Sequence, residues 1–228
     1  MLALVGLAIF VVLLVAAFSS SAPSGPGLGH TTDPNGPPLA QIVATENTNL
    51  QIQLPISQSA VTAIGYHGTD GQSLELTPVG RQANEGILTR MVHWLFGGGG
   101  SGPTYYEFGG AGGPSTGALD IGAAAGTDVY SPVFGTVVSI GTYVLDGKQY
   151  GNTIEIQPTQ EASVVVVVTR LRADPSLTVG ESVSAGLSKI GTVIDLSAVE
   201  RQTLASVTHD AGNHVTLEVD PAPSLPVR

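Results

Sequence analysis

The stretch LDIGAAAGTDVYSPVFGTVVSIG, residues 119–141, decides the fold, and GNHVTLEV, residues 212–219, completes it. Both stretches alternate apolar and small or polar residues with a period of two, which is typical of strands with one buried face. Glycines interrupt the first stretch where the chain turns between strands. Together they predict a β-domain in this part of the chain.

The surrounding sequence extends this pattern over about a hundred residues. Asp146-Gly147 is a hairpin signal, and the run of valines at 164–168 suits a strand buried on both faces. The pattern predicts strands over 118–123, 128–133, 135–141, 153–158, 163–171, 188–197 and 214–220, with one short helix at 196–206.

Composition limits the fold class and the partners. The chain of 228 residues has 30 Gly and 15 Pro, which favour strands and turns over a helical bundle. Its formal net charge of −10 leaves no cationic surface for nucleic acid. It has no cysteine, so a transition-metal site would have to use histidine and carboxylate ligands. The five histidines are His30, His67, His93, His209 and His214.

The amino terminus predicts export. Leu2 to Phe18 is an uncharged apolar run, long enough to cross a bilayer. Ser20-Ser21-Ala22 resembles a cleavage site, so a secreted protein released from a signal peptide is the alternative to a single-pass membrane anchor. Either reading places the remainder outside the cytoplasm.

We therefore expect five segments along the chain. Residues 1–18 are the anchor or signal, 19–43 a flexible Ser/Gly/Pro tether, and 223–228 a tail. Between them, residues 44–113 contain short strands over 50–79, a helix over 84–96 and a Gly-rich linker, and residues 114–222 form the β-domain.

The motifs resemble those of the lysostaphin/LytM-type peptidoglycan metalloendopeptidases, in the same order along the chain. The resemblance rests on residues 119–141, YGNTIEIQP at 150–158, LTVGESVSAGLSKIGTV at 177–193 and GNHVTLEV at 212–219. It implies a mostly β protein with an antiparallel sheet as its core, preceded here by the small α+β region and the amino-terminal helix. It implies zinc as the cofactor and peptidoglycan as the substrate.

The zinc ligands of that family are incomplete here. In its His-x-x-x-Asp motif, Asp120 matches the carboxylate ligand, whereas Thr116 stands at the position of the histidine. In its His-x-His motif, His214 matches the catalytic histidine, and Thr216 replaces the zinc-binding one. A further family histidine corresponds to Arg170 or a neighbour before Leu171, and Arg170 is a fixed cation that opposes a dication. A hydroxyl is a poor zinc ligand beside imidazole, so we expect no bound cofactor.

Three hypotheses follow for the function. The first is a peptidase-like domain without catalytic activity, which binds cell-wall material or a partner hydrolase in a groove containing Thr116, Arg170 and Thr216. The second is an active zinc endopeptidase with rearranged ligands, drawn from Asp120, His209 and His214, with His67 as a further donor. The third is a purely structural extracellular β-domain. The sequence favours the first, because threonine stands at two ligand positions.

Overall fold

The computed structural model describes residues 35–69, 71–84, 102–109 and 114–223. In these residues the protein is mostly β, as predicted, and its helical content is one 3₁₀ turn, η1 (Thr203–Ser206). The expected helix over 84–96 and the apolar run Leu2 to Phe18 lie outside the described residues. No helix within them has the length and apolarity needed to cross a bilayer.

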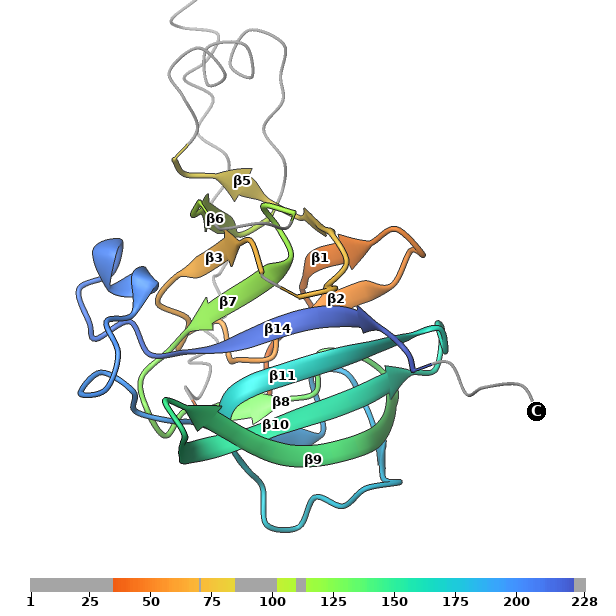
Figure 1. Ribbon diagram of the computed structural model, residues 1–228. Coiled ribbons are helices and arrows are strands. Elements are labelled where there is room, and N and C mark those ends of the chain that lie inside the picture. The colour runs from red at the N-terminus through yellow and green to blue at the C-terminus, as the bar shows by residue number, and fades with distance from the viewer. Residues whose placement is uncertain (1–34, 70, 85–101, 110–113, 224–228) are drawn as a thin grey trace, which may run out of the picture. The chain divides into compact units, whose positions relative to one another are not determined.

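The main sheet is built mostly from antiparallel strands of the carboxyl-terminal half (Figure 1). The order β12-β9-β10-β11-β14-β7-β3-β6-β5 runs across it, and β13 joins β11 to β8. The strands of this half are β7 (Ala118–Gly122), β8 (Asp128–Tyr130), β9 (Gly135–Leu145), β10 (Lys148–Pro158), β11 (Val164–Ala173), β12 (Ser182–Val183), β13 (Lys189–Val193) and β14 (His214–Pro221). The strands predicted between 118 and 220 are all present.

The residues before position 113 contribute to the same sheet. The predicted strands over 50–79 appear as β2 (Gln51–Gln53), β3 (Ile64–His67) and β4 (Leu76–Pro78). β3 pairs with β7 in antiparallel register, so no sheet boundary falls at residue 113. β5 (Arg81–Gln82) and β6 (Thr104–Glu107) extend this edge, and β6 lies within the stretch that the sequence predicted as a linker.

The expected tether, residues 19–43, ends earlier than predicted. Tyr130 donates a hydrogen bond through its hydroxyl to the carbonyl of Asn35, and Pro38 lies against Gly186. β1 (Ile42–Glu46) then forms a three-stranded sheet with β2 and β4. Apolar positions at Val43 and Ala44 are buried, which explains why this part of the segment is ordered on the domain.

The core lies between this small sheet and one face of the main sheet. Alternation along β7 and β14 places Leu119, Ile121, Val215 and Leu217 on that face, all fully buried. They belong to one apolar cluster with Val43, Ile52 and Leu76 of the small sheet. The opposite face of β7 and β14 is therefore free to carry polar groups.

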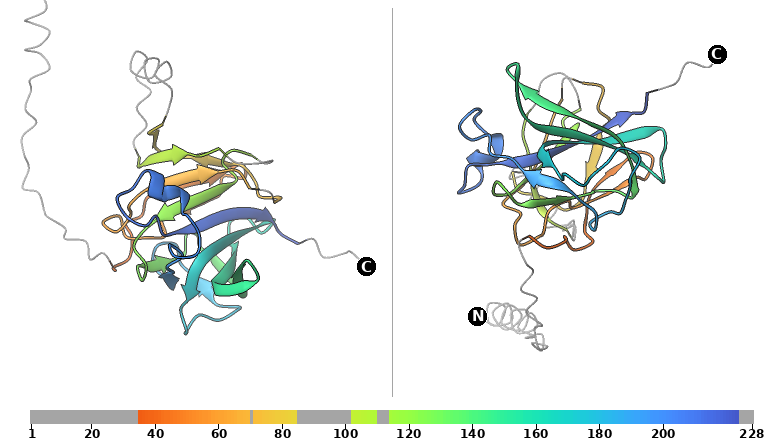
Figure 2. Two further views of the ribbon diagram at one scale, coloured as in Figure 1. Left: turned by 60° about the vertical axis from the view of Figure 1, so that its left-hand side comes forward. Right: turned by 90° about the horizontal axis from the view of Figure 1, so that it is seen from below.

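The predicted helix over 196–206 is reduced to η1. Gln202 is extended, with φ −76° and ψ 131°, so a continuous helix cannot pass through it. Leu204 of η1 lies close to the backbones of Gly65 on β3 and Gly122 on β7, where a Cβ atom would approach it to 2.9 and 3.1 Å. In the left view of Figure 2 the blue segment before β14 crosses in front of these strands. Glycine at both positions lets this segment pack on the polar face of the sheet.

Truncating a core residue of β7 tests the assignment of the two faces. Ile121→Ala is expected to lower the free energy of unfolding by about 3 kcal/mol, because the residue is fully buried. Val144→Ala, at a side chain that is 54% exposed, is the control and should change it by less than about 0.5 kcal/mol. Urea unfolding of the full chain measures both. Equal effects of the two substitutions would contradict this assignment.

Candidate functional site

The polar side chains on this face of the sheet surround Asp120. In the antiparallel register, Asp120 lies opposite Thr216 on β14 and opposite Gly65 on β3. Residues opposite each other share a face, so His214, two residues before Thr216, and His67, two residues after Gly65, are diagonal neighbours of Asp120. Strand pairing thus brings two imidazoles and a hydroxyl to one carboxylate.

The Asp120 carboxylate is buried and its oxygens are shared among these groups. Thr216 donates a hydrogen bond from Oγ1 to Oδ1 over 2.7 Å. His67 Nε2 lies 3.3 Å from Oδ2, and His214 Nε2 lies 3.5 Å from Oδ1. We call Asp120, His67, His214 and Thr216 the Asp120 network.

Both histidines are oriented by the backbone. His67 Nδ1 donates to the carbonyl of Gly68 over 2.9 Å, and His214 Nδ1 donates to the carbonyl of Gly212 over 2.8 Å. In each ring the Nε2 atom consequently faces Asp120. Both nitrogens of His67 lie against acceptors, which favours the doubly protonated ring.

The charges of the network support one another. The hydrogen bond to Asp120 raises the pKa of His67 to about 9, although burial opposes the shift. Burial would raise the pKa of Asp120, but the charge of His214 and the hydrogen bond from His67 outweigh burial and lower it. At neutral pH the network therefore contains a buried carboxylate and a His67 imidazolium.

A cavity of about 360 Å³ opens beside the network. Arg170 forms one side of it and is held by Glu200, with nitrogen to oxygen distances of 3.3 Å at both prongs, and by the amide oxygen of Gln202 at 3.1 Å. Its guanidinium carbon lies 5.6 Å from the centre of the Tyr143 ring. The lining residues are His67, Gly68, Phe108, Gly109, Asp120, Tyr143, Thr169, Arg170, Glu200, Gln202, Thr203, His214, Thr216 and Glu218.

A β-bulge directs Arg170 into this cavity. Asn152 pairs with Leu171 and Ile154 with Val168, so Thr169 and Arg170 together oppose one residue of β10. Arg170 has φ 62°, in the left-handed region, which costs a residue with a Cβ about 1–2 kcal/mol. Bulges commonly redirect side chains at functional sites, and here the redirected guanidinium meets Glu200 and Gln202.

Of the residues singled out in the sequence, the structure brings Asp120, Arg170, His214 and Thr216 together in the cavity. Thr116 lies in the turn before β7 and does not line it; its Oγ1 is buried without a hydrogen-bond partner in the described residues. His209 is exposed in the segment after η1 and does not line the cavity either.

The sequence did not assign His67 a definite place, although it named it as a further donor. The alternation of IGYH places Ile64 and Tyr66 on the core face and His67 on the opposite one. Only the pairing of β3 with β7 shows that this opposite face is the one with Asp120. Glu200 and Gln202 had no local sequence signal, whereas the alternation of β14 places Glu218 on the same face as His214 and Thr216.

Zinc, the cofactor implied by the sequence resemblance, does not fit these residues. A zinc site needs at least three ligand atoms about 2.0–2.3 Å from one point. His67 Nε2 and His214 Nε2 instead face different oxygens of Asp120. In residues 35–69, 71–84, 102–109 and 114–223, no group of three His, Cys, Asp or Glu side chains is arranged to hold a metal ion.

Comparisons with known proteins return distant similarities among solved structures. No family model matches the chain, and no curated protein matches it. Lysostaphin is 19% identical over 48% of this chain and 38% of its own, with a TM-score of 0.35. The deep-sea M23 metalloprotease pseudoalterin is 12% identical over 75% and 70%, with a TM-score of 0.40. A zinc-containing peptidase from Vibrio cholerae is 15% identical over 79% and 45%, with a TM-score of 0.34.

These structural neighbours are all of the LytM/M23 type, the family that the sequence motifs resemble. The chain spans less than half the length of lysostaphin and of the Vibrio cholerae peptidase. At such low identities and TM-scores, the similarities carry no argument about activity.

The raised pKa of His67 predicts a pH-dependent stability. Its ordinary value is 6.5, so its contribution is complete below that pH and is lost as the pH rises through about 9. Raising the pH from 6 to 10 should lower the free energy of unfolding more in the wild type than in His67→Gln. We expect a difference of about 1–2 kcal/mol, which allows for the 32% exposure of the His67 side chain. Urea unfolding of both chains across this range gives the difference. Parallel losses in the two chains would show that His67 is not the responsible group.

Proposed function

We propose that this chain is an exported, membrane-tethered domain of the LytM peptidase type that binds cell-wall material without cleaving it. The order of the motifs over residues 119–219 supports the domain type. The apolar run Leu2 to Phe18 and the Ser/Gly/Pro-rich residues after it support export and tethering. The cavity beside the Asp120 network is the proposed binding site.

The observation that carries this proposal is that the polar groups of the Asp120 network are bound to one another. Its carboxylate holds the Thr216 hydroxyl at 2.7 Å and the His67 Nε2 atom at 3.3 Å, so its oxygens are already engaged by the protein. A general base needs a free lone pair directed at the substrate, whereas the Nε2 atoms of His67 and His214 both face Asp120. Each polar group here stabilises its neighbour.

The cavity has the size and lining of a binding site. Its volume of about 360 Å³ lies in the range of small-ligand pockets. Phe108 directly follows β6 and Tyr143 lies on β9, and the strands β10, β11, β14, β7 and β3 lie between them in the sheet order. The strands between them offer Thr169 and Thr216 as well as charged groups. An extended peptide that crosses these strands could contact both aromatic rings.

Two other functions would use the same face differently. A peptide segment of a partner hydrolase could occupy the cavity in place of cell-wall peptide. An active zinc endopeptidase with rearranged ligands has in its favour the approach of two imidazoles to within 3.5 Å of one carboxylate. It would require His67 to lose a proton and both rings to turn toward a common point.

The metal content separates the binding domain from the zinc enzyme. We expect the full chain, purified in the presence of zinc and then dialysed, to retain no stoichiometric zinc, because the described donors do not converge. Elemental analysis against the protein concentration measures this. One tightly bound equivalent, lost in His67→Ala and in Asp120→Ala, would overturn the proposal in favour of the enzyme.

Blocking the cavity tests the binding function. Thr203→Trp, on the exposed end of η1 that lines the cavity, is expected to reduce retention of the full chain on purified peptidoglycan by about tenfold. Ser206→Trp is the matched control, because it is exposed on the same 3₁₀ turn but does not line the cavity. Failure of the wild type to bind peptidoglycan would favour the partner-hydrolase or purely structural alternatives. Equal retention of both variants would place binding elsewhere on the chain.

A further inference from the structure

Three large apolar side chains are exposed on a surface of the protein that is remote from the cavity in its residues. They are Leu39, Phe134 and Leu187, and each is at least half exposed to solvent. Their segments are far apart in the sequence, and the fold brings them together. We call these three side chains the apolar patch.

Contacts between the three segments place the patch on one surface. Pro38, directly before the first patch residue, and Gln53 both lie within 4 Å of the position that a Cβ atom of Gly186 would take. Gly186 directly precedes the last patch residue. Gln53 also lines a small hollow together with Phe134. The three side chains are therefore neighbours.

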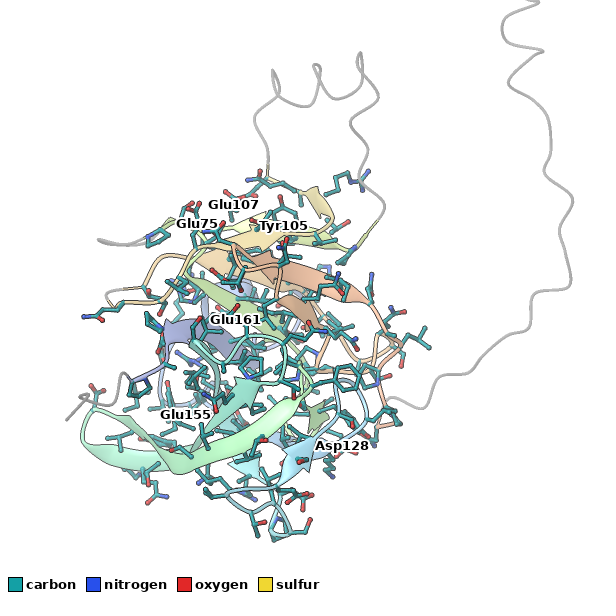
Figure 3. All side chains as sticks on the ribbon, turned by 90° about the vertical axis from the view of Figure 1, so that its right-hand side faces the viewer. Glu75, Tyr105, Glu107, Asp128, Glu155 and Glu161 are labelled. Atoms are coloured by element: carbon teal, nitrogen blue, oxygen red, sulfur yellow. The ribbon has the colours of Figure 1, made fainter. Side chains whose placement is uncertain are left out.

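The segments that form this surface contain no Asp, Glu, Lys or Arg. They are residues 35–45, 50–58, 129–145 and 182–188. The 18 acidic and 8 basic residues of the chain all lie elsewhere. At the border of the surface, Lys189 and Asp128 pair with each other over 2.6 Å. Figure 3 shows Asp128 at this end of the domain and the carboxylates Glu75 and Glu107 toward the opposite end.

An uncharged surface with exposed leucine and phenylalanine suits the boundary between the headgroups and acyl chains of a bilayer. Apolar side chains gain free energy when they enter this boundary. No charged group of the protein has to leave water when they do so. Because the surface has no Lys or Arg, its contact with a bilayer would not depend on anionic lipids. A neutral phospholipid surface is therefore the partner that fits this chemistry.

The connection to the proposed anchor begins beside the same surface. Tyr130 donates a hydrogen bond from its hydroxyl to the carbonyl of Asn35 over 3.1 Å. The next residue, Ser131, accepts a backbone hydrogen bond from Gly186. Sixteen residues, 19–34, separate Asn35 from the apolar run. Even fully extended they span at most about 56 Å. A bilayer that contains the run is thus held near the patch, and a weak apolar contact is sufficient at such a high effective concentration.

We propose that the apolar patch docks the domain on the surface of the membrane that holds its anchor. This inference rests on the membrane tethering that is part of the proposed function, and it adds a second contact that fixes the orientation of the domain. The patch shares no residue with the described lining of the cavity, so docking and ligand binding use different side chains.

Fluorescence quenching of the full chain in phosphatidylcholine vesicles tests this proposal. The chain has no cysteine, so Leu187→Cys carries a single fluorescent label. We expect a quencher on the lipid acyl chain, close to the headgroup, to remove several times more fluorescence from this label than from one at Val144→Cys. Val144 is the matched control, because it is apolar, 54% exposed and at the opposite end of β9 from Phe134.

A charge introduced into the patch tests its role in docking. With the label at Leu39→Cys, Phe134→Glu should reduce quenching to the level of the Val144 control, because the new carboxylate resists removal from water. Both positions are at least half exposed, so the fold should tolerate the changes. Quenching that persists in Phe134→Glu would overturn the role of the patch.

Flotation of the vesicles in a density gradient separates failure of docking from failure of the tether. Equal quenching at Leu187 and Val144 in a chain that floats with the vesicles would overturn docking and leave the tether standing. A chain that does not float would overturn the tether, and docking with it. A label at Leu187 that escapes lipid quenching but transfers energy to a second labelled chain would show that another copy covers the patch, which would contradict membrane contact.

Discussion

The buried carboxylate of Asp120 is the constraint on which the polar face of this protein depends. An ionised carboxylate removed from water costs several kcal/mol unless it is paired and hydrogen-bonded. β7 supplies this carboxylate, and its two neighbouring strands supply the groups that stabilise it. Thr216 on β14 and His67 on β3 both contact it directly. The strand register is consequently tied to the electrostatics of the site.

The shape of the cavity follows from local departures from regular sheet geometry. The bulge at Thr169 and Arg170 turns the guanidinium onto the polar face, where Glu200 holds it. Gly65 and Gly122 have no Cβ, so Leu204 can pack directly over their strands and fix the segment that carries Glu200. A sheet face that would otherwise be an open groove thereby gains a wall. The proposed binding site and the stability of the fold share these residues, so variants away from the Asp120 network are the more informative tests of the proposal.

Much of the sheet could be predicted from the sequence because alternation is a local signal. The pattern of 214–220 placed His214 and Thr216 on one face, and the structure confirms it. The place of His67 could not be predicted, since its approach to Asp120 depends on the pairing of strands more than fifty residues apart. Thr116 fails as a groove residue because a turn precedes β7 and interrupts the alternation.

The protonation state of His67 tests the central claim most directly. Nitrogen NMR of the full chain with ¹⁵N-labelled histidine, at neutral pH and with and without one equivalent of zinc, reports on both ring nitrogens. We expect Nδ1 and Nε2 of His67 both to be protonated and zinc to leave their chemical shifts unchanged. A neutral ring whose Nε2 resonance moves on addition of zinc would contradict it, because Asp120 would then be neutralised by a metal ion and not by His67.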